Sequence, residues 1–515
     1  MPSEHGDTFC IHPWTRLRLQ SNGSAQVCCN YQSGGISDSG SPMSLERHSL
    51  ADIWNSEEMR SVRRAMVDGR QVPGCRSCYA DEAKGVVSMR IRDNEQFGGG
   101  FLNEAKQTID QLRSLAVSHD FQLPVLPVSI EVDVGSLCNL KCRMCHGGSS
   151  SRIAADPVHS SWSADFYSGS AYHDESAASL QTAPRVFSIT QKALEAALKE
   201  SPGQIRRLYF IGGEPLIVRG VGDVLERLIE TGDDKDTELA IVSNGSMTRS
   251  WLPLTKTFKR TDMAISIDGF DEHYDYIRYP AKWRNLAKSL AAFKEMAYVN
   301  LGASVTIQAY NALHITSLFR YLDSMEISFF AYPIHLPRHL TLDVMPPAAR
   351  REAAKRLAEY VDRDCRPQHV AVIRGLIGQF NQTNDALDAR LVRDFMRFTN
   401  DLDATRRQRV HDVNPELVSF LEAAGFPWSF ETLHAPLAPS PKHGVKIHPT
   451  AEATPTPETP LPIRHESVKG LDLPKRITAL EGLSKLVEVR WMLRKLSRLQ
   501  TRDKAAEVNG IRQSV

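Results

Sequence analysis

Apolar residues in the middle of the chain gather in short β-rich runs, each followed by polar residues or glycine. These runs are Val128–Val134, Leu208–Ile211, Leu239–Val242, Met263–Ile267, Val305–Gln308 and Ile327–Ala331. Between them, helical spacing of apolar positions predicts helices at Ser188–Lys199, Val224–Glu230, Trp283–Met296 and Leu313–Leu322. Strands that alternate with helices predict an α/β fold with a parallel sheet, either doubly wound or barrel-like. Both architectures place active sites where the strands end.

The first 95 residues predict a small domain of a different kind. Thr15–Leu19 alternates apolar and polar residues like a strand, and Ser21–Gly23 is a turn signal. Ala25–Cys28 fits the returning strand of a hairpin. Further on, Leu50–Val67 has the spacing of one continuous helix.

The whole chain divides into six predicted regions. In chain order they are a cysteine-rich α+β domain (1–95), a polar connector (96–126), the strand–helix core (127–345), a helical region (346–428), a proline-rich linker (429–474) and a basic amphipathic helix (475–515). Helices of the fourth region are predicted at Pro347–Arg363, Ala386–Met396 and Pro415–Ala424. The linker holds eight prolines between residues 436 and 462, a pattern typical of extended or disordered chain.

Charge and hydropathy exclude several classes of protein. The 515 residues hold 62 Lys and Arg against 61 Asp and Glu, so no overall basicity indicates a nucleic-acid partner. No apolar run is long enough to span a bilayer, and the first thirty residues lack the apolar core of a secretory signal. We therefore expect a cytoplasmic protein. Only the last region is strongly basic, with ten Lys or Arg against four Asp or Glu, a net charge of +6. Its amphipathic pattern allows contact with an anionic membrane or a partner.

Eight of the nine cysteines lie in two groups. The first eighty residues hold Cys10, Cys28, Cys29, Cys75 and Cys78, and a tight triplet follows the first core strand at Cys138, Cys142 and Cys145. Only Cys365 is isolated. In a reducing compartment, clustered thiols usually bind metal or do redox chemistry.

The triplet has C-x3-C-x2-C spacing, which suits three corners of a cubane iron–sulfur cluster. With no fourth cysteine nearby, one iron would keep an open coordination site, and an open site is a reaction site. Two alternatives remain. His146 offers a fourth ligand for zinc, and Cys142–His146 fits the C-x-x-C-H pattern of haem attachment, which needs an exported protein.

The triplet resembles the signature of the radical SAM superfamily. The resemblance implies a partial (β/α)6 barrel with a [4Fe–4S] cluster whose open iron chelates S-adenosylmethionine, and whose reduction gives a 5′-deoxyadenosyl radical. Gly212-Gly213-Glu214-Pro215 matches the family's GGE-type motif after the second strand. Its backbone and Glu214 are thereby implied to hold the methionyl ammonium, since glycines allow close backbone approach and a carboxylate pairs with an ammonium.

Five further residues match cofactor or substrate positions of that family. The resemblance implies that Ser266 and Asp268 bond the ribose, and that Asn244 and Asn311 point toward cofactor or substrate. It also implies that Arg278 reaches the methionyl carboxylate. For each of them a helix cap, a turn or a surface position is the alternative. Met144 departs from the aromatic residue often found before the third cysteine, so no adenine stacking is expected there.

The N-terminal cysteines resemble the opening of a SPASM or shortened twitch domain, which carries auxiliary iron–sulfur clusters. The resemblance implies one auxiliary [4Fe–4S] cluster on Cys10, Cys28, Cys75 and Cys78, with Cys29 as a substitute ligand. Such a domain usually follows the barrel, whereas here it precedes it. A structural zinc on the same four residues is the alternative.

The leading hypothesis is a radical SAM enzyme that abstracts hydrogen from its substrate. The resemblance favours a peptide or protein substrate over a small molecule such as a sugar or antibiotic intermediate, and implies an electron donor such as flavodoxin or ferredoxin. A zinc-binding protein without catalytic activity is the competing class.

Overall fold

The computed structural model describes residues 8–32, 35–83, 87–98, 109–162, 187–246, 251–382 and 386–429. Residues up to Pro439 form one unit and the residues after it form another. The predicted basic helix at 475–515, and all but the first residue of the predicted linker, lie outside the described residues. No helix in the described ranges is both long and apolar enough to cross a membrane.

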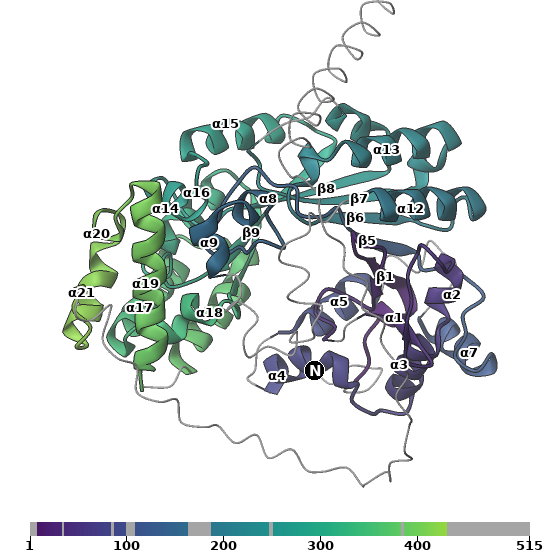
Figure 1. Cartoon of the computed structure of the whole chain (residues 1–515), viewed down its shortest axis with the longest axis horizontal. Coiled ribbons are helices and arrows are strands. Elements are labelled where there is room, and N and C mark those ends of the chain that lie inside the picture. The colour runs from purple at the N-terminus through teal and green to yellow at the C-terminus, as the bar shows by residue number, and fades with distance from the viewer. Residues whose placement is uncertain are drawn as a thin grey trace, which may run out of the picture. The chain divides into compact units, whose positions relative to one another are not determined.

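One eight-stranded sheet organises the first unit, in the order β10-β9-β8-β7-β6-β5-β1-β2 (Figure 1). Its six core strands are all parallel, and each pairs with the next in the chain. They are β5 (Ser129–Asp133), β6 (Arg207–Ile211), β7 (Glu238–Ser243), β8 (Arg260–Ser266), β9 (Val299–Ile307) and β10 (Ser328–Pro333). Six parallel strands in sequential order, joined by helical crossovers, confirm the predicted (β/α)6 architecture.

Helices connect these strands where the sequence predicts them. The crossover helices are α12 (Ser188–Glu200), α13 (Arg219–Thr231), α15 (Trp283–Lys294) and α16 (Ile315–Ser324). Shorter helices lie in the same connections, namely α8 (Ser151–Ala154), α9 (Pro157–Ser161) and α14 (Glu272–Ile277).

The two faces of the sheet differ in chemistry because side chains alternate along each strand. One face is apolar, and residues such as Val132, Phe210 and Ile265 are fully buried there. Strand registers place polar and aromatic side chains on the other face, which we call the polar face. Its members include Arg18, Glu131, Tyr209, Asp262, Ser266, Ser304, Phe330 and Tyr332.

The N-terminal hairpin extends the barrel sheet. Strand β1 (Arg16–Leu19) pairs in parallel with β5, and β2 (Ala25–Gln26) pairs with β1 in the antiparallel direction. Gly23 supplies the positive φ of +84° that the predicted turn needs. The hairpin was predicted, but its parallel pairing with β5 was not, because the chain between them spans more than a hundred residues.

The predicted helix Leu50–Val67 is wrong in one respect, because it is two helices. They are α2 (Leu50–Trp54) and α3 (Glu57–Val67), and Ser56 separates them. The Ser56 hydroxyl accepts a hydrogen bond from the Met59 backbone N–H, so it caps α3 and starts a new helix. The rest of this region contains α1 (His12–Thr15), β3 (Ser37–Asp38), β4 (Ser41–Pro42), α4 (Arg76–Ala83), α5 (Met89–Gly98) and α7 (Ile109–Ser118).

The C-terminal helical region contains more helix than predicted. Helix α17 (Pro347–Arg363) has the predicted bounds, and α21 (Pro415–Ala423) ends one residue early. Two differences are larger. Helix α18 (Val370–Gln382) was not predicted, and α19 runs over Ala389–Arg406, ten residues beyond the predicted end. A short helix, α20 (Val410–Val413), follows it.

Candidate functional site

The cysteine triplet lies on a loop that begins where β5 ends. Two backbone hydrogen bonds hold this loop against the chain after β8. The Lys141 N–H donates to the Tyr279 carbonyl at 2.7 Å, and the Arg143 N–H donates to the Ile277 carbonyl at 2.9 Å. Cys142 is buried, and Cys138 and Cys145 are half-buried. The loop therefore presents three cysteines at the carboxyl end of the sheet.

The three thiols influence one another. Burial and the neighbouring Cys142 raise the pKa of Cys138 to about 12. The hydrogen bond between Cys142 and Cys145 lowers the pKa of Cys142 and raises that of Cys145 well above its ordinary value. Buried thiolates so close together repel one another, so they need nearby positive charge. Bound iron supplies that charge, which makes the donor set fit an iron–sulfur cluster.

Within the described ranges, no three His, Cys, Asp or Glu side chains are close enough together to hold one metal ion. A cubane cluster is bound differently, because its ligating thiolates bind separate iron atoms.

The two glycines of the GGE-type motif pack against the chain that leads to Cys138. The Gly213 N–H donates to the Gly135 carbonyl at 2.6 Å. A Cβ on Gly213 would lie 2.4 Å from the Leu137 carbonyl oxygen, so only glycine fits. Gly212 has a φ of +123°, and a Cβ there would clash with Asp133 and Gly135. Their small size is thus needed for contact between β6 and the cysteine loop.

Glu214 is 1% exposed and accepts three hydrogen bonds from its own chain. The donors are the Leu216 N–H at 2.9 Å, the Ser243 hydroxyl at 2.9 Å and the Asn244 N–H at 2.6 Å. Burial raises the pKa of this carboxyl group, and these hydrogen bonds oppose the shift. Glu214 thus joins the end of β6 to the end of β7, and Pro215 begins the 3-10 helix Pro215–Ile217 that Glu214 caps.

Asn244 connects the end of β7 to the cysteine loop. Its side-chain amide donates to the side-chain Oδ1 of Asn139 at 2.9 Å and lies 3.9 Å from the Cys138 sulfur. Asn139 in turn donates to the Ser246 hydroxyl at 2.8 Å. Sequence analysis missed Asn139, although its position between the first two cysteines could have indicated a structural role.

Asp268 and Arg278 form a buried ion pair next to the triplet. The Arg278 Nε and Nη2 atoms both lie 2.7 Å from Asp268 Oδ2, and its Nη1 lies 3.9 Å from the Cys142 sulfur. Burial raises the pKa of Asp268, while the charge of Arg278 opposes the shift. The pair therefore links the end of β8 to the second cysteine.

Asn311 supports this end of the sheet from within. Its amide donates to the Asp268 and Thr306 carbonyls, both at 2.8 Å, and its oxygen accepts the Gln308 N–H at 2.8 Å. These contacts account for a structural role of Asn311. Ser266 is half-buried on the polar face, in register with Ser304.

The N-terminal cysteines form a second group. Burial is the largest cause of the raised pKa of Cys10, and the next is the charge of Cys75. Burial and then Cys78 raise the pKa of Cys75 to about 12. Burial raises the pKa of Cys28 well above its ordinary value, followed by the charges of Cys29, Cys10 and Cys75. The structure thus brings the four predicted ligands together.

Cys29 has different surroundings. After burial, the groups that most affect its pKa are Glu131 and Arg18 on the polar face. Its sulfur lies 3.7 Å from the Met89 sulfur. These neighbours place Cys29 toward the polar face and make Cys28 the better ligand of the two.

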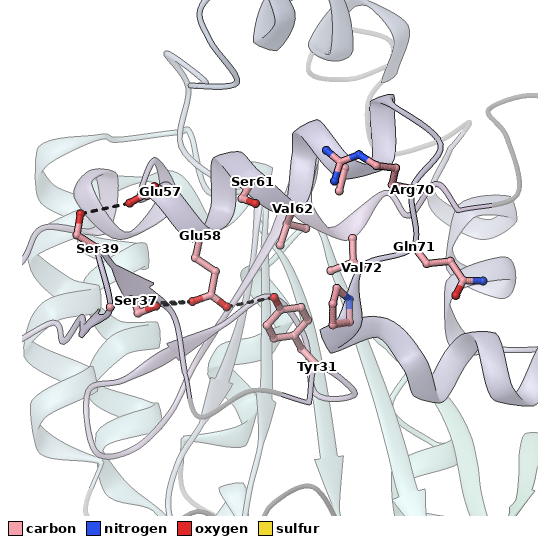
Figure 2. Close-up of a pocket in the computed structure, with 13 residues that line it drawn as sticks. Tyr31, Ser37, Ser39, Glu57, Glu58, Ser61, Val62, Arg70, Gln71 and Val72 are labelled. Atoms are coloured by element: carbon pink, nitrogen blue, oxygen red, sulfur yellow. Dashed lines mark hydrogen bonds between the residues drawn. The ribbon is translucent and has the colours of Figure 1, made fainter. Parts of the chain in front are cut away.

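A pocket of about 520 Å³ lies on the N-terminal region (Figure 2). Glu58 lies in its wall and accepts hydrogen bonds from the Tyr31 hydroxyl at 3.1 Å and from the Ser37 N–H at 2.8 Å. Figure 2 also shows Glu57 bonded to Ser39. None of the eight grouped cysteines lines this pocket, and we assign it no function.

Two family models match the chain where these two cysteine groups lie. Residues 132–311 match the radical SAM superfamily, and residues 10–79 match SPASM, an iron–sulfur cluster-binding domain. The chain therefore contains a radical SAM domain at residues 132–311, and a SPASM domain precedes it at residues 10–79. These domains bind a [4Fe–4S] cluster with S-adenosylmethionine and auxiliary iron–sulfur clusters, respectively.

Solved structures with a similar fold include native anSMEcpe with bound AdoMet. It is 17% identical with a TM-score of 0.32, over 46% of this chain and 61% of that one. Streptococcus suis SuiB bound to the precursor peptide SuiA is 13% identical with a TM-score of 0.30, over 59% and 63%. The chain thus covers less than two thirds of either protein. A search of curated proteins gives no match.

Proposed function

We propose that this protein is a radical SAM enzyme that abstracts a hydrogen atom from a peptide or protein substrate. The observation that carries the proposal is the group of three cysteines at the carboxyl end of β5, enclosed by the ends of β6, β7 and β8. When bound, the cluster and S-adenosylmethionine supply the 5′-deoxyadenosyl radical.

In this proposal Cys138, Cys142 and Cys145 hold the cluster. The Asn244 amide and the Arg278 guanidinium each lie 3.9 Å from one of these sulfurs and stabilise its negative charge. Gly212 and Gly213 allow the close backbone contact that fixes the loop. Glu214 orients the ends of β6 and β7, and we assign its remaining acceptor capacity to the methionyl ammonium.

The ribose and the methionyl carboxylate are assigned to the ends of β8 and β9. Ser266 is half-buried and available on the polar face, whereas both Asp268 oxygens already accept protein hydrogen bonds. Arg278 is 7% exposed and points between Asp268 and Cys142, which suits a second anionic partner. Asn311 keeps these groups in place.

The polar face supports a substrate with large side chains. Phe330 and Tyr332 on β10 are 53% and 50% exposed, although most large apolar residues of the described chain are buried. Large exposed apolar side chains that lie together on one surface mark binding sites for ligands or partners. Together with the SPASM domain, they favour a peptide over a sugar. An external one-electron donor such as flavodoxin or ferredoxin completes the reaction.

Cys10, Cys28, Cys75 and Cys78 are proposed to hold one auxiliary cluster. The match to an iron–sulfur cluster-binding domain favours iron over the zinc alternative.

The experiment compares three variants of the full chain after anaerobic reconstitution. Replacing Cys138, Cys142 and Cys145 by Ala should abolish 5′-deoxyadenosine formation with dithionite. The double variant Cys75→Ala, Cys78→Ala should lose about four iron atoms, the content of one cubane cluster. Cys365→Ala removes the isolated cysteine and should change neither quantity. Continued 5′-deoxyadenosine formation by the triple variant would refute the cluster assignment.

A further inference from the structure

Helix α19 contacts the cysteine loop from a region that lies outside both family matches. Its Asp403 forms an ion pair with Arg143, which stands between the second and third cysteines of the triplet. Asp403 Oδ1 lies 2.5 Å from Arg143 Nη2, and Arg143 is fully buried. The two residues are 260 positions apart in the chain. A buried ion pair of this kind fixes the loop only if its remaining groups are also held.

Most of those groups are held, and in the described chain only Nη1 of the Arg143 guanidinium has no hydrogen-bond partner. The Arg143 guanidinium stacks on the Tyr276 ring, with 3.6 Å between Cζ and the ring centroid, and its Nε donates to the Tyr276 carbonyl at 3.0 Å. Asp403 also accepts the Tyr276 hydroxyl at 2.8 Å and the Val410 N–H at 2.7 Å. One carboxylate thus connects the cysteine loop, helix α14 and helix α20.

Arg406, three residues further along α19, is 5% exposed and lies beside the same loop. Its Nη2 donates to His159 Nδ1 at 3.0 Å. Its Cζ lies 5.1 Å from the centroid of the Tyr279 ring, and the Tyr279 carbonyl accepts the Lys141 N–H next to Cys142. Within the described chain, its Nε and Nη1 atoms have no hydrogen-bond partner.

The charges around Arg406 indicate what offsets its buried guanidinium. Arg143 and Arg406 are both buried. In the described part of the chain, Asp403 is the only carboxylate that forms an ion pair with either of them. His159 is neutral, because burial and then the charge of Arg406 lower its pKa to about 3. Asp156 also acts on Arg406, but it forms its own ion pair with Lys141 at 2.6 Å. A surplus positive charge therefore remains beside three thiols that become thiolates when they bind iron. Such a charge is costly unless an anionic group offsets it.

We propose that α19 is a positioning element of the cysteine loop, in which Asp403 fixes Arg143 and Arg406 supplies a buried positive charge that raises the midpoint potential of the cluster. The inference rests on the proposed function, because it assumes a cluster on Cys138, Cys142 and Cys145. Reduction adds negative charge to a cluster, so a nearby cation favours the reduced form.

The test measures the midpoint potential by electron paramagnetic resonance during a redox titration of the reconstituted full chain. The signal followed is the one that changes when S-adenosylmethionine is added, which separates this cluster from the auxiliary one. Arg406→Gln should shift the one-electron equilibrium about tenfold toward the oxidised form, equivalent to about 59 mV. Arg390→Gln, an exposed arginine in the first turn of α19, is the matched control and should leave the potential unchanged.

Arg406→Lys separates charge from shape. It keeps the positive charge, so its potential should stay close to that of the unmodified protein. Equal shifts for Lys and Gln would overturn the proposal, as would an unchanged potential in Arg406→Gln with iron content intact. If Arg406→Gln fails to fold, Arg406→Lys alone decides, because a tenfold shift of its one-electron equilibrium would contradict the proposal. Absence of the signal in the unmodified protein would refute the proposed function instead.

Asp403→Asn tests the positioning part of the inference. Loss of the ion pair should loosen the Arg143 contact and speed the loss of iron to a chelator severalfold, while Arg390→Gln should lose iron at the original rate. Equal rates in Asp403→Asn and the unmodified protein would show that α19 does not hold the loop.

Discussion

Glu214 shows what sequence motifs and structure each contribute at the scale of a single residue. The motif identified it as a site residue, but it did not reveal that its carboxylate accepts three hydrogen bonds from Leu216, Ser243 and Asn244. Those partners come from two strand ends, and nothing in the local sequence of Glu214 specifies them. Asn311 is similar, since its partners lie on a neighbouring strand end.

We expect Glu214→Gln to destabilise the fold even without bound cofactor. Glutamine has one acceptor oxygen, and its NH2 group would face N–H and hydroxyl donors. Leaving buried donors unpaired costs about 1–3 kcal/mol. Urea unfolding at neutral pH measures the change. Glu226→Gln on the exposed face of α13 is the control and should be neutral. Equal unfolding midpoints for both variants would contradict this role.

His339 should make stability depend on pH. It is buried between Trp162 and Phe398, with ring centroids at 5.5 and 4.6 Å, and burial lowers its pKa to about 4. The unfolded value is about 6.5, so the unfolded chain binds more protons between these values. Stability is therefore complete above pH 6.5 and is lost as the pH falls toward 4.

At pH 5.5 this histidine alone should cost about 1.4 kcal/mol relative to its contribution at high pH. His339→Phe keeps an aromatic ring in the same place and should remove that part of the loss. Unfolding free energies at pH 7.5 and 5.5 give the comparison, with the exposed His119→Gln as the control. If His339→Phe loses as much stability as the unmodified protein, the histidine is not responsible.

At the scale of helices and strands, short β-rich apolar runs identified all six core strands, because every core strand buries one of its faces in the apolar layer. Helix α18 escaped detection because Gly375 and Gly378 weaken its helical signal, and it is the packing of Ile373 and Leu376 in the core that stabilises it. The break between α2 and α3 was not predicted, because the helical spacing of apolar residues continues across the N-cap Ser56.

The contact between β6 and the cysteine loop gives a prediction at this scale. Gly213→Ala would place a methyl group 2.4 Å from the Leu137 carbonyl, so the backbone before Cys138 has to move. We expect reconstituted protein to lose about four iron atoms per chain, the content of one cluster. Gly375→Ala is the matched control, because no atom lies within 4 Å of a Cβ there. It should raise stability by about 0.5–1 kcal/mol. Full iron content in Gly213→Ala would refute the contact's importance.

At the scale of the whole molecule, the sequence predicted two domains that bind clusters but not how they share a sheet. Leu17 and Leu19 of β1 are buried next to Ile130 and Val132 of β5 in the same apolar layer. Arg18 of β1 also lies 3.5 Å from Glu131, a fully buried carboxylate on the polar face. The boundary predicted at residue 95 therefore separates regions that fold together.

Deleting residues 1–95 should consequently damage the barrel as well as remove five cysteines. The edge of β5 would lose its parallel partner, and an uncovered apolar edge strand promotes aggregation. Glu131 would also lose the arginines beside it, and an unpaired buried charge costs about 3–5 kcal/mol. We expect this truncated chain to aggregate, as size-exclusion chromatography would show. A chain ending at Pro439 removes a similar length but leaves the first unit whole, so it should remain monodisperse. A well-behaved barrel without residues 1–95 would mean that β1 is an attachment to the sheet rather than part of its core.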